Sequence, residues 1–600
     1  MKFFKSLIAA TLGTFLALLI AFFVLVITFS GSGQAPEPYI RDNTVLEVHM
    51  SGSLPARDAR SPLEELFPTA ANSGVSLQSL RENLDKAASH DNIGGVLLEI
   101  DVMTAGWASL EEARRIIDRF REDSDKFIYT TTNDIGLNEK GYYLASATDS
   151  VFSPPETFFE FDGFYSEVMF LEGLFNKIGL EAEIARHGEY KGAVEPFMQQ
   201  ELSEENREQL NAIVGRAGAT FVEAASAKSG LESAQVHSLL NGQPQMSARF
   251  GYENGFIDSL LYRDELENHM KGRLGVDAGD ELQTVDFKRY TRVTSSSAGL
   301  TSPSTQDRIA VIYASGMIAP DPFTDSPFGE GQMISTSFFE EQLEEIRDDG
   351  DVKALVVRVN SPGGSGSTSD AIWRMLNQMR DEMPVIVSMG DMAASGGYYI
   401  AAAADTILAE TNTLTGSIGV FSTKFNAQQL FNEKLGLTFG TVTSHEHADW
   451  LSPSRGFTPS EQQAFQKYVD RFYDTFITKM AASRGMEKQR IDELAGGRVW
   501  TGEAAQQNGL VDLLGGMDRA LEVAAAKAGL EAYRVSSYPE PESLFEFFMG
   551  SAQTQVRSWV RSLVPGSTLT AEAAIEAERA MGIFGRRDPL TLFPYDITVE

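Results

Sequence analysis

Six hundred residues are more than one hydrophobic core organises, so the chain should fold as two or more domains. Its 42% hydrophobic and 22% charged residues are typical of a folded protein and argue against a disordered chain. The formal charge of −34 argues against nucleic acid as a main partner, and the absence of cysteine excludes disulfides, thiolate metal sites and a cysteine nucleophile.

An uncharged apolar run, Leu7 to Phe29, follows Lys2 and Lys5 at the N-terminus. At about 1.5 Å per residue, this run can cross a bilayer core of about 30 Å. A cleaved signal peptide is the alternative, but its apolar region usually spans about 7–15 residues and ends at a small-x-small site. Bulky residues continue here up to Ser30. We therefore expect a retained anchor over residues 1–30, with a cytoplasmic N-terminus because the lysines precede the span.

Two similar segments follow, in which the same strings recur in the same order. The matching pairs are VLEVHMSGSL (from 45) and IAVIYASGMI (309), GGVLLEID (94) and KALVVRVN (353), GYYLASATD (141) and GYYIAAAAD (397), LFNKIGL (174) and LFNEKLGL (430), and NGFIDSL (254) and NGLVDLL (508). Five ordered matches at nearly constant separation indicate tandem homologous domains.

The repeats and the linkers divide the chain. Residues 31–42 form a short polar tether, and residues 291–307 form a linker rich in Ser and Thr. We expect an N-terminal domain over 43–290, a C-terminal domain over 308–538 and a C-terminal extension over 539–600. The extension places apolar side chains on short helical stretches, which favours packing on a domain or a neighbouring subunit and leaves a role near membrane or substrate open.

Strand and helix signals alternate along each repeat. In the second repeat, the β-branched run ALVVRVN (354–360) predicts a buried strand, and the spacing of Ile372, Met375, Leu376 and Met379 predicts a helix. A strand at PVIVSM (384–389) and a helix at SGGYYIAAAA (395–404) follow, and residues from about 460 to 530 look helical. This alternation predicts an α/β fold with a mostly parallel sheet covered by helices.

Two short motifs could carry chemistry. Asn360-Ser361-Pro362-Gly363-Gly364 follows a predicted strand, and its glycines let backbone amides approach a bound oxyanion, although an ordinary turn is the alternative. Ser395 lies between small residues at a predicted strand-to-helix corner, where free amides and the helix dipole would suit a nucleophile. The alternative for Ser395 is an N-cap.

The repeat favours the nucleophile. The first repeat has Glu139 opposite Ser395 and Lys140 opposite Gly396, although both repeats continue with GYY and an alanine-rich helix. A serine present in one of two similar scaffolds is less expected to serve the scaffold. Its base is not obvious, because no histidine lies between residues 270 and 444. His445 and His447 stay possible bases, and a lysine made neutral by burial is the other option.

The strings VNSPGGS, GDMAASGGYYIAAAAD, TLTGSIGV, EYKGAVEPF and GRVWTGEAAQQNGLVD resemble those of signal peptide peptidase A (protease IV) of the long, two-domain, Gram-negative type. The resemblance extends over most of the chain. It implies that Ser395 is the nucleophile, Lys191 the general base and Ser417 the hydrogen-bond partner of that lysine. It also implies that the amides of Gly363, Gly364 and Gly396 form the oxyanion hole. Gly192 departs from this pattern, because the family often has serine there.

The same resemblance implies tandem ClpP/crotonase-like domains, a homotetramer, and an enzyme of the bacterial inner membrane with a single span and periplasmic catalytic domains. The implied partners are the lipid bilayer and apolar peptides, notably signal peptide remnants left after leader cleavage. The Ser–Lys chemistry requires no cofactor and no metal. Two rivals stay open: a crotonase-type enzyme acting on acyl-thioesters, and an inactive membrane scaffold.

The repeat adds an independent argument about the pair. Lys191 lies in the first repeat, and the matching place in the second is near Ala448, where there is no lysine. Each half thus lacks what the other has. We expect Ser395 and Lys191 to meet across a boundary between domains or between subunits, and the sequence leaves open which of the two it is.

Overall fold

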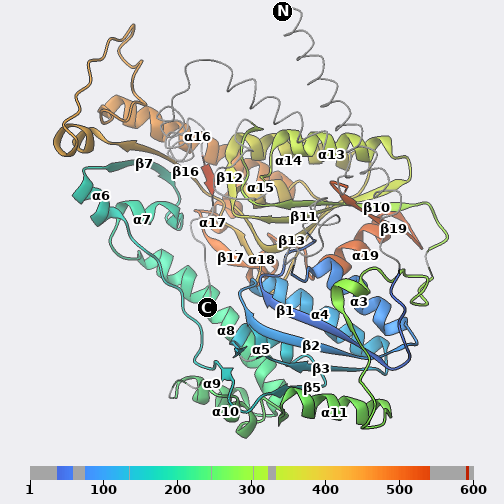
Figure 1. Ribbon diagram of the computed structural model, residues 1–600. Coiled ribbons are helices and arrows are strands. Elements are labelled where there is room, and N and C mark those ends of the chain that lie inside the picture. The colour runs from blue at the N-terminus through green and yellow to red at the C-terminus, as the bar shows by residue number, and fades with distance from the viewer. Residues whose placement is uncertain are drawn as a thin grey trace, which may run out of the picture.

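The computed structural model describes residues 37–58, 74–133, 135–242, 244, 246–301, 303–321, 333–540 and 590–592. Figure 1 shows two α/β halves, the N-terminal half in blue to green and the C-terminal half in yellow to red. The predicted anchor and most of the predicted extension lie outside the described residues. Within the described ranges, no helix combines the length and the apolar character needed to cross a membrane.

Six parallel strands form the sheet of the N-terminal half. In spatial order they are β8 (Ser259–Leu260), β5 (Ser150–Ser153), β3 (Phe127–Thr131), β2 (Ile93–Met103), β1 (Thr44–Gly52) and β9 (Thr284–Asp286). Parallel neighbours require long crossovers, which the intervening helices provide. The apolar side chains of the central strands β1 and β2 are buried, as expected for parallel strands covered on both faces.

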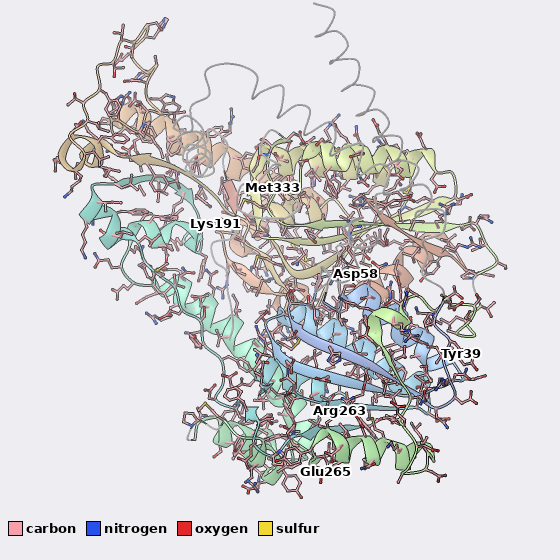
Figure 2. All side chains as sticks on the ribbon, viewed as in Figure 1. Tyr39, Asp58, Lys191, Arg263, Glu265 and Met333 are labelled. Atoms are coloured by element: carbon pink, nitrogen blue, oxygen red, sulfur yellow. The ribbon has the colours of Figure 1, made fainter. Side chains whose placement is uncertain are left out.

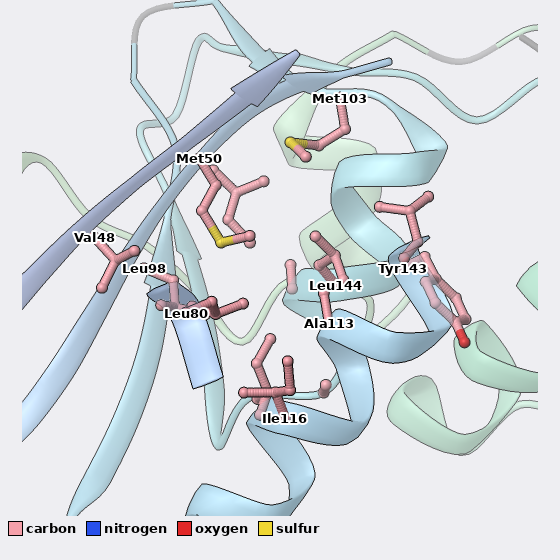
Figure 3. Packing of buried hydrophobic residues seen from close by; sticks show 14 of the residues in the cluster. Val48, Met50, Leu80, Leu98, Met103, Ala113, Ile116, Tyr143 and Leu144 are labelled. Atoms are coloured by element: carbon pink, nitrogen blue, oxygen red, sulfur yellow. The ribbon is translucent and has the colours of Figure 1, made fainter. Parts of the chain in front are cut away.

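Helices cover both faces of this sheet. The helices of this half are α3 (Leu77–Ser89), α4 (Trp107–Asp123), α5 (Glu139–Ala145), α6 (Glu172–Ile178), α7 (Glu195–Met198), α8 (Glu204–Ser229), α9 (Ser233–Leu240), α10 (Ala248–Glu253), α11 (Arg263–Leu274) and α12 (Phe287–Tyr290). Figure 3 shows side chains of β1 and β2, such as Val48 and Leu98, packed in one core with Leu80, Ile116 and Leu144 from helices α3, α4 and α5. Helix α11 packs Leu266 and Met270 against the opposite face.

The C-terminal half repeats this strand order. Its strands β18 (Leu513–Leu514), β14 (Thr406–Ala409), β13 (Val385–Ala394), β11 (Val352–Ser361), β10 (Arg308–Ser315) and β19 (Arg534–Tyr538) are parallel and follow the same spatial path. Strand β13 forks: its first part pairs with β14, and Met392–Ala394 pairs with β15 (Leu414–Gly416), which carries β17 (Val499–Thr501). The predicted α/β class and the parallel sheets are therefore confirmed.

The helices predicted after 354–360 and at 395–404 are confirmed, but the region from about 460 to 530 is not helical throughout, because β17 and β18 interrupt it. The helices of the C-terminal half are α13 (Thr336–Asp348), α14 (Gly366–Arg380), α15 (Gly396–Ala401), α16 (Pro459–Arg484), α17 (Lys488–Leu494), α18 (Gly502–Asn508) and α19 (Met517–Ala528). Helices α13 to α16 pack in one core with the sheet, and α19 covers the other face. The predicted linker is not extended: Val293 and Ala298 are buried against the N-terminal half.

A third sheet joins the two halves. Strand β7 (Glu181–His187) of the N-terminal half pairs antiparallel with β16 (Val420–Asn426) of the C-terminal half, from Val420 opposite His187 to Asn426 opposite Glu181. The short strands β20 (Leu590–Leu592) and β12 (Gly363–Ser365) continue this sheet beyond β16. Because β7 leads directly toward Lys191, this pairing carries the lysine into the C-terminal half.

Candidate active site

Ser395 occupies the sharp corner between β13 and α15. Its φ is 56° and its ψ −112°, a backbone conformation that non-glycine residues rarely adopt. The corner is held by hydrogen bonds on both sides, because the Ser395 N–H donates to the Gly416 carbonyl at 2.8 Å and the Tyr399 N–H donates to the Ser395 carbonyl at 2.8 Å. The buried hydroxyl does not cap α15. Ser395 thus occupies the N-cap position of α15 without serving as a capping side chain.

Lys191 brings its side-chain amine to this hydroxyl. It follows β7, precedes the 3₁₀ turn η1 (Gly192–Val194), and is fully buried. Its Nζ lies 2.8 Å from Ser395 Oγ, 2.9 Å from Ser417 Oγ and 3.1 Å from the Ser417 carbonyl oxygen. Figure 2 shows Lys191 where the teal segment that carries it meets strands of the C-terminal half. The structure thus brings all three predicted side chains together within one chain.

The lysine stem is enclosed by glycines of the C-terminal half. A Cβ at Gly497 would lie 2.6 Å from the Lys191 Cβ, and one at Gly419 would lie 3.2 Å from its Cδ. Gly497 also has φ +83°, so a side chain there would meet both strain and overlap. The Tyr190 N–H donates to the Gly496 carbonyl at 2.9 Å. Sequence reasoning missed this pair of glycines, although two consecutive glycines before Arg498 are a visible signal.

Glu195 shapes the turn after Lys191, and sequence reasoning also missed it. Its buried carboxylate accepts hydrogen bonds from the Ser203 hydroxyl at 2.6 Å and the Asn206 amide at 2.9 Å. The Asn206 side chain in turn fills the space beside Gly192, since a Cβ there would lie 2.3 Å from Asn206 Nδ2. This packing explains why glycine replaces the serine that is common at position 192 in the family the sequence resembles.

Burial controls the ionisation of Lys191. Removal from water disfavours the ammonium form and lowers the pKa of Lys191 well below its usual 10.5, and no carboxylate among the described residues offsets this effect. Ser417 faces the amine from a residue with φ 50°, and its N–H donates to the Arg498 carbonyl at 2.7 Å. A neutral amine held between two hydroxyls can accept a proton from one of them.

The glycines expected to bind an oxyanion lie at two neighbouring turns. Gly363 and Gly364 begin β12, and a Cβ at Gly364 would lie 1.9 Å from the Ile318 carbonyl oxygen, so only glycine fits there. The Gly363 N–H donates to Ser361 Oγ at 3.1 Å and would have to exchange this partner for an oxyanion. Gly396 is the first residue of α15, where amides lack acceptors within the helix.

The described strand β20 lies antiparallel to this turn. Leu592 is opposite Gly363, Thr591 opposite Gly364, and Leu590 opposite both Ser365 and Phe421 of β16. An extended chain therefore fits between β12 and β16, beside the predicted oxyanion glycines.

The other candidate groups lie elsewhere. His445 contacts Ser444 Oγ at 3.0 Å and His447 contacts Glu461 at 3.0 Å, so neither replaces Lys191 as the partner of Ser395. In the described residues, one group of carboxylates is close enough to share a cation: Glu139, Glu160 and Asp162 of the N-terminal half. Acidic groups commonly gather in this way without an ion. The expectation that catalysis needs no metal stays a prediction.

Comparisons with known proteins agree on one family. The model of peptidase family S49 matches the chain twice, at residues 123–277 and 377–531. The chain is 37% identical over 481 residues to the chloroplastic serine protease SPPA of Arabidopsis thaliana, covering 80% of this chain and 70% of that protein. It is 30% identical over 527 residues to protease 4 of Salmonella typhi, covering 84% and 82%.

A comparison with solved structures gives a weaker likeness. A point mutant of the 1510-N membrane-bound stomatin-specific protease is 13% identical, with a TM-score of 0.25, over 40% of this chain and all of that one. A likeness of this size carries no argument, so the ClpP/crotonase-like fold stays a prediction.

Proposed function

Because the chain belongs to peptidase family S49 and is a serine protease, we propose that Ser395 and Lys191 are its catalytic dyad. The observation that carries the proposal is the 2.8 Å separation of Lys191 Nζ and Ser395 Oγ, both fully buried. A buried lysine that has no counter-ion among the described residues is disfavoured as a cation. The neutral amine is the form that a general base requires.

The reaction follows from this geometry. The Lys191 amine takes the proton of the Ser395 hydroxyl while Oγ bonds to the scissile carbonyl carbon, whose oxygen gains the negative charge. Backbone amides at Gly364 and Gly396 stabilise that oxyanion. When the C–N bond breaks, the Lys191 ammonium returns its proton to the leaving amine. Lys191 then takes a proton from water while the water oxygen bonds to the acyl carbon. When the ester C–O bond breaks, the Lys191 ammonium gives this proton to Ser395 Oγ, and the acid product leaves. Ser417 orients the amine throughout.

The substrates proposed are apolar peptides, including the remnants of cleaved signal peptides. The slot between β12 and β16, which β20 enters as an antiparallel strand, supports recognition of an extended chain through its backbone. A relative from Enterococcus faecium that is 36% identical over 216 residues bears the description putative signal peptide peptidase SppA. A crotonase-type acyl-thioester reaction is less well supported, because the Ser395–Lys191 contact provides a nucleophile with its base.

We also propose that the apolar run Leu7–Phe29 anchors the enzyme in the bacterial inner membrane, with both domains on the periplasmic side. An anchored site stays close to peptides left in the bilayer. The physical support is the length of the run and the lysines before it. An export direction would also keep the site away from cytoplasmic acyl-thioesters.

Assembly into a homotetramer is proposed from the resemblance, and the repeat suggests how copies would join. Strand β7 pairs with β16 inside the chain, but the equivalents of these strands, residues 438–444 and 164–170, belong to no sheet. Both carry exposed apolar side chains: Tyr165 is 58% exposed, Met169 74%, Phe439 55% and Val442 99%. In Figure 1 the loop that contains residues 438–444 extends away from the body at the upper left. A neighbouring copy can supply the missing strand to each.

The direct test of the dyad is covalent labelling. A fluorophosphonate should label the wild-type protein once and should not label Ser395→Ala, which should also fail to hydrolyse casein. Ser422→Ala is the matched control, because Ser422 is a buried serine of β16 whose hydroxyl has no partner among the described residues. Hydrolysis by Ser395→Ala above about 1% of the wild-type rate would reject the proposal, and an unlabelled wild-type protein would favour the scaffold.

A further inference from the structure

The repeat places two helix N-termini at equivalent positions, and they are capped differently. In the C-terminal half, helix α14 follows Ser365, whose side chain accepts the Thr368 N–H. Aligning GGVLLEID with KALVVRVN makes Gly106 the equivalent of Ser365 and Ser109 the equivalent of Thr368. Gly106 precedes α4 and has no side chain to serve as a cap. The cap of α4 must come from elsewhere.

It comes from the other half of the molecule. The Asp391 carboxylate accepts the Ser109 N–H at 2.8 Å and the Ser109 hydroxyl at 2.6 Å. Gly106 makes room for it, since a Cβ at that position would lie 2.2 Å from the Asp391 Cγ. A carboxylate at a helix N-terminus is favoured both by the free amides and by the helix dipole.

Asp391 lies on the strand that ends at the nucleophile. It belongs to β13, four residues before Ser395. The next residues are fixed on the side of the C-terminal half: the Met392 N–H donates to Asn360 Oδ1 at 3.0 Å, and Met392–Ala394 pairs with β15. The Ser109 contact fixes the same stretch from the N-terminal half. These contacts from both halves therefore help to fix the position of the strained Ser395 corner at the end of β13.

We propose that Asp391 is a positioning residue. By capping α4, it fixes the end of β13 to the N-terminal half and thereby holds Ser395 within hydrogen-bonding distance of Lys191. The N-terminal half then has two roles at the site, supplying the base and fixing the strand of the nucleophile. This inference rests on the proposed dyad. It also accounts for the glycine at position 106, where the second repeat has the capping Ser365, because Asp391 fills the space that a side chain would need.

A structural role alone would make Asp391 replaceable by any cap, and the repeat provides the replacement. In Asp391→Ala the Ser109 N–H and hydroxyl lose their acceptor, so thermal stability and the rate at which fluorophosphonate labels Ser395 should both fall. Adding Gly106→Ser gives α4 the cap that Ser365 gives α14, and the serine side chain no longer overlaps the Asp391 carboxylate, which the first substitution has removed. We expect this double variant to regain the wild-type melting temperature while its labelling rate and kcat stay about 10- to 100-fold low, with KM little changed.

The matched control is Arg119→Gln. Arg119 also lies on α4 and binds the other half, but its partner Asp518 lies on α19, which packs with Ile386 near the start of β13, five residues before Asp391. It should change melting temperature without changing the labelling rate. Recovery of both stability and labelling in the double variant, or unchanged labelling in Asp391→Ala, would overturn the positioning role.

A milder variant covers the case in which Asp391→Ala does not fold. Ser109→Ala removes only the 2.6 Å hydrogen bond to Asp391 and should slow labelling several-fold, whereas unchanged labelling would count against the proposal. Labelling of Ser395→Ala separates the two hypotheses: if that variant still reacts, the dyad fails, whatever Asp391 does.

Discussion

The two strand-to-helix corners of the repeat differ in strain and in chemistry. Ser395 begins the C-terminal corner with φ 56°, and its hydroxyl meets Lys191 at 2.8 Å. At the N-terminal corner, Glu139 is an ordinary first residue of α5, where Asn138 caps the Gly141 N–H. The Glu139 carboxylate accepts the N–H groups of Asp162 at 2.8 Å and Gly163 at 3.0 Å. At the C-terminal corner a hydroxyl faces a base, whereas at the N-terminal corner the Glu139 carboxylate occupies the neighbouring backbone amides.

Most of the strained non-glycine positions among the described residues lie at the candidate active site. Among the described residues, three non-glycine residues have positive φ, and two of them are Ser395 and Ser417. Each such residue costs about 1–3 kcal/mol, which the surrounding structure must offset. The position equivalent to Ser417 is Phe161, which packs on Phe221 and Phe256 in a fully buried cluster. At this position the N-terminal half therefore has a packed aromatic side chain where the C-terminal half has a strained serine of the candidate active site.

Removing the base should have the largest effect. Lys191→Met keeps the length of the stem but has no amine, so hydrolysis should fall by about 10³-fold or more, while burial of an apolar group keeps the fold. The control at the other corner is Glu139→Gln, which should retain most activity. Casein hydrolysis and melting temperature report both. A Lys191→Met variant with more than a tenth of the wild-type activity would mean that another group is the base.

The pH dependence should follow from the lowered pKa of Lys191. Below that pKa the amine is protonated, so log kcat/KM should rise with slope 1, about 10-fold per pH unit, and level off above it. The unfolded lysine stays protonated up to its usual pKa of 10.5, whereas the folded lysine loses its proton at a lower pH. Between the folded and the unfolded pKa, the free energy of unfolding relative to Lys191→Met should therefore rise with pH, by up to about 1.4 kcal/mol per pH unit. A flat activity profile, with chemistry limiting, would break the assignment.

Assembly offers a third comparison between the halves, with a defined register. Applying the β7–β16 register to the equivalent segments 164–170 and 438–444 places Tyr165 opposite Thr443 and Met169 opposite Phe439 in the next copy. Since the chain has no cysteine, Tyr165→Cys and Thr443→Cys together should form intermolecular disulfides that appear as a ladder on a denaturing gel. The shifted pair Tyr165→Cys and Phe439→Cys, about 13 Å out of register, should give several-fold less. Equal yields would reject this pairing.

Much of this arrangement could be predicted from the repeat, and the reasons for the rest are physical. Complementary losses, with Glu139 opposite Ser395 and Ala448 opposite Lys191, pointed to one site shared by two halves. The alternation of strands predicted the parallel sheets. The sequence could not say whether the pair forms within one chain, because that depends on the β7–β16 pairing, whose residues lie far apart along the chain.

Close approach was equally invisible to the sequence. Gly497 packs on the Lys191 stem, and Asp391 replaces a cap that Gly106 lacks, but a distance between distant segments has no local signature. The departure at Gly192 could be seen but not explained until Asn206 was placed beside it. The sequence motifs and the repeat thus identified the reactive residues, whereas the contacts that position them could be seen only in the tertiary structure.

The smallest expected effect is at the N-terminal corner and has the opposite sign. Burial raises the pKa of Glu139 above its usual 4.5, although the Asp162 and Gly163 amides oppose this. The folded carboxyl then binds a proton more readily than the unfolded one, so its contribution to stability is present below pH 4.5 and is lost as pH rises through the folded pKa. Glu139→Gln should flatten this decline by about 1 kcal/mol or less, measured by urea unfolding in mildly acidic buffer. If Glu139 and Lys191 instead contributed equal losses of stability as the pH falls, the predicted opposite pH dependence of the two corners would be wrong.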